Sequence, residues 1–246
     1  MKLLVLAAGY GTRLKELGEA TPKALLPING KPLLSFILDR TKNLMGLNEI
    51  IVVTNDKFYT QFLNWSKQEK SVNAPITVVN DRTLTAEDRL GSIGDIQFVL
   101  DNVKVNDDLL VVGGDNLFDF NLEEYFEFAK NNTNSVSIGL FDIHNKEDAK
   151  KFGVVNLDKN NTVTLFEEKP QNPKSTLIAM CFYYLPKSTL ACVNQYLAEV
   201  KKSDTAGDYI RWLLENGKVY GFQFSGSWYD IGSIEAYNEA KVKFKA

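Results

Sequence analysis

Short apolar runs alternate with longer segments of helical periodicity through the first part of this 246-residue chain. The apolar runs are Lys2–Ala7, Glu49–Thr54, Ile76–Asn80, Leu109–Gly113 and Val136–Phe141. The helical patterns cover Pro32–Met45, Asp56–Lys70, Asp95–Val103 and Leu122–Asn131, and Pro32 suits a first helical position. Apolar strands covered by helices on both faces are typical of a doubly wound, mostly parallel sheet. The alternation therefore predicts an α/β fold of this kind.

The pattern changes from Phe152 onward. Two β-like segments flank the Asn-bearing turn Lys159–Asn161 and predict a β-hairpin, and Leu177–Leu185 predicts another strand. The remaining predicted elements are helices over Ser188–Lys201 and Gly207–Asn216, a strand over Val219–Phe224 and a helix over Ser233–Phe244. We therefore expect a Rossmann-like doubly wound sheet with a smaller antiparallel β sub-region.

The composition narrows the classes of partner. The chain is 44% hydrophobic and 24% charged, and its length suits one large domain with a buried core. Its net charge of −3 argues against nucleic acid or an anionic membrane as the main partner. No apolar stretch approaches the ~20 residues that span a bilayer, and the apolar start is too short and glycine-rich for a signal peptide. We expect a cytoplasmic protein that binds small molecules.

Cysteine and histidine are scarce. Cys181 and Cys192 are the two cysteines, both in apolar patterns where buried free thiols are usual, and His144 is the sole histidine. Catalysis by a histidine base or a cysteine nucleophile is therefore not expected. Any bound metal should have oxygen ligands.

A glycine-rich turn follows the first apolar run and is succeeded by two basic residues. Gly9 and Gly11 allow backbone N–H groups to approach an anion, while Arg13 offers a planar fork of donors and Lys23 a mobile charge. This pattern favours binding of a nucleoside triphosphate. From the glycines alone, an ordinary strand-to-loop turn with solvated basic residues remains open.

Two other glycine motifs fail on specific residues. The phosphate-binding pattern GxxxxGK[ST] does not occur in the chain. The dinucleotide pattern GxGxxG would require a glycine at Leu14, and the nearest acidic residue for a ribose, Asp39, lies in a helical pattern.

An acidic residue follows another apolar run. Asp115 comes directly after DLLVVGG, which places it at the carboxyl end of a predicted strand, where open α/β sheets bind ligands. Gly113 and Gly114 leave room for a phosphate chain. Taken alone, Asp115 is better explained as a cap of the loop or of the next helix.

The strings GYGTRL (residues 9–14) and TPKALLPINGKP (residues 21–32) closely resemble the signature of the sugar-1-phosphate nucleotidylyltransferases, and with later motifs the resemblance extends over nearly the whole chain. It implies that the nucleotide is bound by Leu6, Ala8, Gly9, Gly11, Thr12, Arg13, Lys23, Asn80, Gly91 and Asp115. It also implies a Mg²⁺ ion on Asp115 and on Asp230 of the later motif SWYDIGS.

The resemblance places the sugar phosphate in the second part of the chain. FGVV (residues 152–155) implies a sugar contact at Gly153, and EEKP (residues 167–170) implies contacts from Glu168 and Lys169. Because neighbouring strand residues face opposite sides, Glu168 and Lys169 share a pocket only if the strand bends, and Pro170 favours a bend. The alternative is a charged edge strand kept soluble by these residues.

Three positions bear on which base and which sugar are bound. Asn80 stands where relatives that bind thymine or uracil often have Gln, Gly91 takes the position of the base-contacting glycine, and Cys181 replaces a glycine common beside the sugar. The base and the sugar are therefore open from sequence.

The implied reaction joins a nucleoside triphosphate, dTTP or UTP being favoured, to a sugar 1-phosphate, glucose 1-phosphate being favoured, and releases pyrophosphate. Its catalytic residues would be Arg13, Lys23, Asp115, Lys169 and Asp230.

We expect one domain over residues 1–246, with 1–145 mainly for the nucleotide and 146–246 mainly for the sugar phosphate. The chain ends soon after SWYDIGS, so a catalytic domain without a carboxyl-terminal β-helix is expected.

Two alternatives to this function stay open. One is cytidylyl transfer to a non-sugar phosphate such as phosphocholine, which shares the amino-terminal signature. The other is a catalytically silent nucleotide sensor, although the charged site residues are all present. Family members commonly form dimers or tetramers, so a homo-oligomer is also open.

Overall fold

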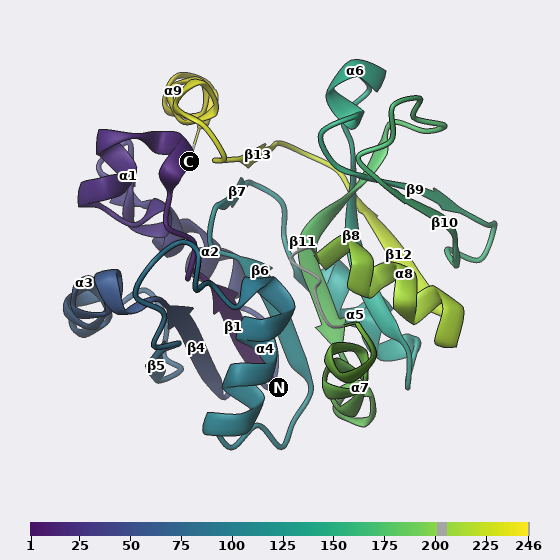
Figure 1. Ribbon diagram of the computed structural model, residues 1–246, viewed down its shortest axis with the longest axis horizontal. Coiled ribbons are helices and arrows are strands. Elements are labelled where there is room, and N and C mark those ends of the chain that lie inside the picture. The colour runs from purple at the N-terminus through teal and green to yellow at the C-terminus, as the bar shows by residue number, and fades with distance from the viewer. Residues whose placement is uncertain (201–205, 246) are drawn as a thin grey trace.

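The structure is a computed structural model that describes residues 1–200 and 206–245. Within these residues one nine-stranded sheet forms the centre of the molecule (Figure 1). Its strand order is β10 (Val163–Glu168), β9 (Gly153–Leu157), β11 (Leu177–Leu185), β6 (Leu109–Gly113), β1 (Lys2–Leu6), β4 (Glu49–Thr54) and β5 (Ile76–Asn80). In addition, β8 (Val136–Asp142) pairs with β11, and β12 (Val219–Phe224) pairs with β8.

The strand directions confirm a mostly parallel sheet. β6, β1, β4 and β5 are parallel, so that Leu4 pairs with Ile51 on one side and Val111 on the other. β12 is also parallel to β8. β11 is antiparallel to both β6 and β8, and it separates these two strands. The predicted hairpin is the antiparallel pair β9 and β10, with Asn161 in its turn at φ +61°.

Helices cover both faces of the sheet, because successive strand residues point to opposite sides. Leu3 belongs to one buried cluster, together with residues of α2 (Leu33–Thr41), α3 (Asp56–Gln68) and α5 (Glu123–Asn131). Leu4 belongs to the other cluster, together with residues of α4 (Gly91–Asn102), α7 (Ala191–Glu199) and α8 (Ala206–Asn216). This is the doubly wound arrangement that the sequence predicted.

Short elements gather at the carboxyl ends of the parallel strands (Figure 1). They include two further two-stranded sheets, one of β7 (Asn116–Phe118) with β13 (Trp228–Asp230) and one of β2 (Pro27–Ile28) with β3 (Lys31–Pro32). The helices in this region are η1 (Thr12–Leu14), α1 (Glu16–Ala20), η2 (Lys23–Leu25), α6 (Lys146–Ala149) and α9 (Ile234–Lys243). The short helix η3 (Lys187–Thr189) lies at the opposite edge of the sheet, where the Lys187 N–H donates to Asp108 just before β6. The β7–β13 pair joins segments that are more than one hundred residues apart in the chain.

A register shift divides β11 into two parts. The carboxyl part, from Phe182 to Leu185, pairs with β6, while Ile178 in the amino part pairs with Val154 of β9. The register against β8 shifts between Ala179 and Tyr183. Irregularities of this kind bend a strand and are common beside active sites. Here the bend moves β11 from β6 toward β9 and opens a space beyond the end of β6.

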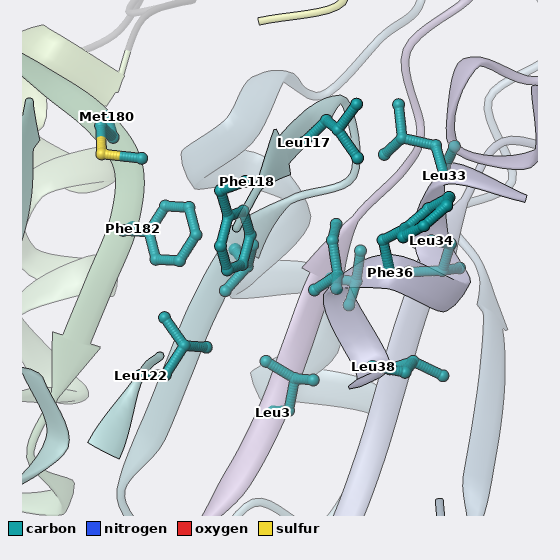
Figure 2. Packing of buried hydrophobic residues seen from close by; sticks show 14 of the residues in the cluster. Leu3, Leu33, Leu34, Phe36, Leu38, Leu117, Phe118, Leu122, Met180 and Phe182 are labelled. Atoms are coloured by element: carbon teal, nitrogen blue, oxygen red, sulfur yellow. The ribbon is translucent and has the colours of Figure 1, made fainter. Parts of the chain in front are cut away.

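An aromatic cluster supports this region from beneath. The rings of Phe118 and Phe182 lie side by side in Figure 2, with centroids 5.0 Å apart, and Phe120 stacks on Phe224 at 4.2 Å. Phe182 has no exposed surface. The cluster fixes β7, which follows Asp115, against the bent strand β11.

Several predicted boundaries were wrong. Pro32 is not the first helical residue, because it lies extended before α2 and pairs with Pro27. The helix expected over Asp95–Val103 begins at Gly91, since burial outweighs the low helix propensity of Gly91 and Gly94. The helix expected over Ser188–Lys201 is split into η3 and α7, and Lys201 lies outside the described residues.

No helix among residues 1–200 and 206–245 is both long enough and apolar enough to cross a membrane.

Replacing Phe182 with alanine tests the aromatic support. We expect the free energy of unfolding to fall by about 3–5 kcal/mol, because a fully buried ring is lost and a cavity remains. Urea denaturation measures this change. Val242→Ala is the control, because Val242 is 84% exposed and its truncation should change stability by about 0.5 kcal/mol or less. Equal effects of the two substitutions would contradict this account of the packing.

Candidate active site

A cavity of about 320 Å³ opens where β11 leaves β6. Its walls come from seven segments of the chain that are separated in sequence. They are lined by Ser92, Asp115, Asn116, Lys151, Phe152, Gly153, Phe166, Glu168, Lys169, Ala179, Met180, Cys181, Tyr183, Ala206, Gly207, Ile210, Trp228 and Asp230. A second cavity of about 760 Å³ shares Lys151, Phe152, Trp228 and Asp230 with the first and adds Arg13. The two cavities therefore adjoin.

Asp115 and Asp230 meet through backbone pairing. Asp115 follows β6, and Asn116, the first residue of β7, pairs with Asp230 of β13. The N–H of Ile231 donates to the carbonyl oxygen of Asp115 at 2.9 Å. Two acidic side chains more than one hundred residues apart are thus held next to each other at the carboxyl end of a central strand.

The charges of these two acids interact strongly. Burial raises the pKa of Asp230 to about 7, the negative charge of Asp115 adds to the rise, and Lys23 and Arg13 oppose it. Lys23 Nζ lies 3.4 Å from Asp115 Oδ2, and the Lys23 side chain is 15% exposed. A third positive charge, such as a divalent cation between the carboxylates, would remove the remaining repulsion.

The glycine-rich turn positions Arg13. Gly11 has φ +65° and begins η1, which carries Arg13. The turn is packed closely, because a Cβ atom at Gly18 would lie 2.3 Å from the carbonyl oxygen of Gly11. The Arg13 guanidinium passes beside Gly232, where an added Cβ atom would lie 3.7 Å from its nitrogens. Arg13 therefore reaches the Asp230 loop.

The opposite wall of the first cavity carries Glu168 and Lys169. The backbone turns sharply at Lys169, where φ is +44°, so both neighbouring side chains line the cavity. Lys169 Nζ lies 3.6 Å from Glu168 Oε1. The expected bend is thus present, at Lys169 itself, and the expected edge strand is present too, because β10 ends the sheet.

Two glycines leave room for these side chains. A Cβ atom at Gly153 would lie 2.4 Å from the Phe166 ring, and one at Gly207 would lie 2.2 Å from Glu168 Oε2. Any other residue at these two positions would displace Phe166 or Glu168. The predicted sugar contact Gly153 therefore also has a packing role.

The predicted nucleotide residues lie along a neighbouring edge. Leu6, Ala8, Gly9, Gly11 and Thr12 form the end of β1 and the turn after it, and they line neither of the two cavities. Two hydrogen bonds to backbone carbonyl oxygens hold this turn. The carbonyl oxygen of Leu6 accepts from the Gly114 N–H at 2.8 Å, and that of Ala8 accepts from the side-chain amide Nδ2 of Asn55 at 2.9 Å.

Asn80 and Gly91 also lie outside the lining of these cavities. Asn80 uses its side chain locally, because its Nδ2 donates to Asp56 and its Oδ1 accepts from the Arg82 N–H. Gly91 adopts φ +76° at the start of α4, a conformation that favours glycine, and the next residue, Ser92, lines the first cavity. Their assignment to the nucleotide stays a prediction.

The sequence analysis missed several cavity residues. Lys151 lines both cavities, and its position just before the FGVV motif was a usable signal. Trp228 Nε1 donates to Asn116 Oδ1 at 2.7 Å and fixes the β7–β13 pair, but no local pattern linked these residues. Gly207 was placed only within a helix.

Cys181 sits at the bend of β11 and lines the first cavity. Burial and the nearby charge of Asp115 raise the pKa of its thiol to about 12. The group is therefore a neutral thiol near neutral pH, which makes it a poor nucleophile. Cys181 and Cys192 are both free, and both are partly rather than fully buried.

The site suits a metal bound by few protein ligands. In the described part of the chain no group of three or more His, Cys, Asp or Glu side chains is placed to hold a metal ion. Asp115 and Asp230 alone would supply two hard oxygen ligands, and phosphate oxygens and water would complete the shell that Mg²⁺ prefers.

Asp230→Asn should stabilise the protein at pH 8 in the presence of a chelator. The pKa of folded Asp230, about 7, exceeds its ordinary value of 3.8, so the folded state retains a proton that the unfolded chain loses. The contribution of Asp230 to the free energy of unfolding thus falls as the pH rises from about 4 to about 7, and it stays low above pH 7. Thermal midpoints should rise in the variant at pH 8 and differ little at pH 4.5. A lower thermal midpoint of the variant at pH 8 would refute the conclusion that the charge of Asp230 destabilises the folded protein.

Comparison with known proteins agrees with this geometry. Residues 2–246 match the family model described as nucleotidyl transferase. The chain is 30% identical over 233 residues to the bifunctional protein GlmU of Methanocaldococcus jannaschii. The aligned region covers 94% of this chain and 51% of that protein. It thus spans about half the length of this curated relative.

A solved structure is similar over the whole chain. A crystal structure from Bacillus anthracis, provisionally identified as a glucose-1-phosphate thymidylyltransferase and solved with sucrose, matches with a TM-score of 0.79 at 25% identity, covering 100% of this chain and 97% of that one. The family match, together with the site on the expected strand ends, shows that the chain belongs to the nucleotidyl transferase family and confirms its resemblance to the sugar-1-phosphate nucleotidylyltransferases.

Proposed function

We propose that the protein transfers a nucleotidyl group from a nucleoside triphosphate to a sugar 1-phosphate with the help of Mg²⁺. The carrying observation is that one pair of adjoining cavities contains both Asp115 with Asp230 and, on the opposite wall, Glu168 with Lys169. Acids that suit a metal and a cation that suits a second phosphate therefore face one space.

The chemistry needs alignment more than proton transfer. An oxygen of the sugar phosphate attacks the α-phosphorus, a new P–O bond forms, and the bond to the β-phosphate bridging oxygen breaks to release pyrophosphate. A phosphate dianion is already a nucleophile, so no general base is required. This agrees with a site whose thiol, Cys181, stays protonated.

Basic residues on both sides bring the two anions together. Arg13 and Lys23, on the nucleotide side, would neutralise the triphosphate and the leaving pyrophosphate. Lys169 would hold the attacking phosphate, and Lys151, which lines both cavities, would add a charge between them. Glu168 would accept hydrogen bonds from sugar hydroxyls.

Asp115 and Asp230 would hold the Mg²⁺ ion, with Lys23 beside Asp115. When bound, the ion would polarise the α-phosphoryl group and offset charge on the phosphates. The raised pKa of Asp230 supports this role, since it reflects the burial of a carboxyl group beside the negative charge of Asp115, and a cation would favour the ionised form of both acids.

For substrate choice we favour dTTP or UTP with glucose 1-phosphate. Support comes from the similar Bacillus anthracis structure, identified provisionally as a glucose-1-phosphate thymidylyltransferase. A matrix of five nucleoside triphosphates against several sugar 1-phosphates, with pyrophosphate release as readout, tests the choice. Phosphocholine should be included, because turnover with CTP and phosphocholine alone would overturn the sugar assignment.

Asp115→Ala should lower metal-dependent pyrophosphate release at least about a hundredfold, the usual effect of losing one preorganised charge contact. Circular dichroism should show an unchanged fold. Glu127→Ala removes a carboxylate from the exposed surface of α5 and should leave the rate unchanged. Full activity of the Asp115 variant would exclude this residue from catalysis.

Lys169→Ala should raise KM for the sugar phosphate about tenfold or more, because a charge-assisted bond to the phosphate is lost, with a smaller effect on KM for the nucleotide. Steady-state kinetics with each substrate varied in turn measures both constants. Lys174→Ala is the matched control, since Lys174 is 61% exposed and pairs with Glu167 outside the cavity lining. If only the KM for the nucleotide rose, Lys169 would contact the nucleotide and not the sugar phosphate, and this assignment would be wrong.

A further inference from the structure

A second pair of acids is buried away from the cavities. Asp81, directly after β5, is 3% exposed, and Asp95, the fifth residue of α4, is 6% exposed. Each of the two carboxyl groups acts on the pKa of the other. Asp81 Oδ2 and Asp95 Oδ1 are fully buried, and no donor group among the described residues is directed at either atom. A hydrogen bond between two carboxyl groups requires a proton on one of them.

The surroundings favour such a proton. Burial, followed by the charge of Asp81, raises the pKa of Asp95 to about 8, and burial also raises that of Asp81. Further acidic groups act on this region: Asp56 acts on Asp81, and Asp56 and Asp88 act on nearby Tyr10. The adjacent Arg82 directs its guanidinium over the ring of Phe98 at 5.9 Å.

Hydrogen bonds connect the pair to the glycine-rich turn. Asp81 Oδ1 accepts from the Thr83 N–H at 2.7 Å and from Thr83 Oγ1 at 2.8 Å. Thr83 Oγ1 in turn accepts from the Tyr10 hydroxyl at 3.1 Å. Tyr10 stands between Gly9 and Gly11, so the acid pair is linked to the turn beside which Arg13 lies.

The pair is also linked to the first cavity through α4. Asp95 lies one helical turn after Gly91 and Ser92, and Ser92 lines the cavity. The end of β5, the start of α4 and the glycine-rich turn thus meet around one buried contact. A displacement of Asp95 from Asp81 would move the predicted nucleotide residues at both ends.

We propose that Asp81 and Asp95 are positioning residues that share one proton, and that this proton holds the glycine-rich turn and the start of α4 in the arrangement that binds the nucleoside triphosphate. The inference rests on the proposed function and adds that binding of the nucleoside triphosphate depends on this proton. Loss of the proton would leave two buried, mutually repelling carboxylates. Nucleotide binding should weaken as a result, while the sugar phosphate side should change little.

Asp95→Asn provides the test, because the amide supplies a permanent donor of nearly the same shape. In the wild-type protein, KM for the nucleotide should rise about tenfold between pH 7 and pH 9, the effect of losing one required proton with this pKa. In the variant this rise should be absent, with kcat and KM for the sugar phosphate near wild-type values. Asp101→Asn, on the exposed part of α4, should keep the wild-type pH dependence.

Two measurements that need no turnover complete the test. The infrared C=O stretch of a protonated carboxylic acid should be recorded in an Asp230→Asn background, because Asp230 itself titrates near pH 7. In that background the band should be present at pH 6.5, disappear with a midpoint near pH 8, and be missing once Asp95→Asn is added. Direct titration with the nucleoside triphosphate should show the same pH pattern as KM. Binding with this pattern but without transfer would refute the proposed function and support the shared proton. Absence of the infrared band, or an unchanged alkaline rise in the variant, would overturn the proposal.

Discussion

The pairing of β13 with β7 is the contact on which the candidate site depends. It places Asp230 opposite Asn116 and next to Asp115, although the two acids repel each other. Backbone hydrogen bonds and the bond from Trp228 Nε1 to Asn116 hold the pair in place, and the aromatic rings around Phe118 and Phe182 fix β7 below. The fold therefore holds two carboxyl groups side by side, and Lys23 and Arg13 offset their repulsion only in part. Such a site is suited to a cation.

The bend in β11 provides the second half of the site. If β11 remained beside β6 along its whole length, the space beyond Asp115 would be filled by the strand. Instead, the register shift between Ala179 and Tyr183 turns the amino part toward β9, which carries the hairpin with Glu168 and Lys169. One irregularity thus opens the cavity and also moves its opposite wall into position.

The sequence predicted those features that have a local signal. Apolar runs located the parallel strands, and the residues flanking them located Asp115 and the glycine-rich turn. Long-range pairings lack such a signal, which is why the insertion of β11 between β6 and β8 and the contact of Trp228 with Asn116 were not predicted. The left-handed backbone at Lys169 was expected only as a bend near Pro170, because φ > 0 is unusual for lysine. Asp95 gave no signal at all, since an acid in a helical pattern usually faces solvent.

The surroundings of each pair of acidic side chains determine whether a cation or a proton can reduce the repulsion between them. Asp115 and Asp230 face a cavity, with Lys23 3.4 Å from one and Arg13 acting on the other, so their site is open to an ion and already partly compensated. Asp81 and Asp95 are almost inaccessible, and Asp56 adds a further negative charge that acts on Asp81. A hydrated cation has no route to such a position and a proton does, because it needs no coordination shell. The same fold therefore holds one carboxylate pair suited to a metal in the proposed active site and one suited to a proton behind the predicted nucleotide residues. Divalent cations should affect only the first pair, whereas pH should affect both.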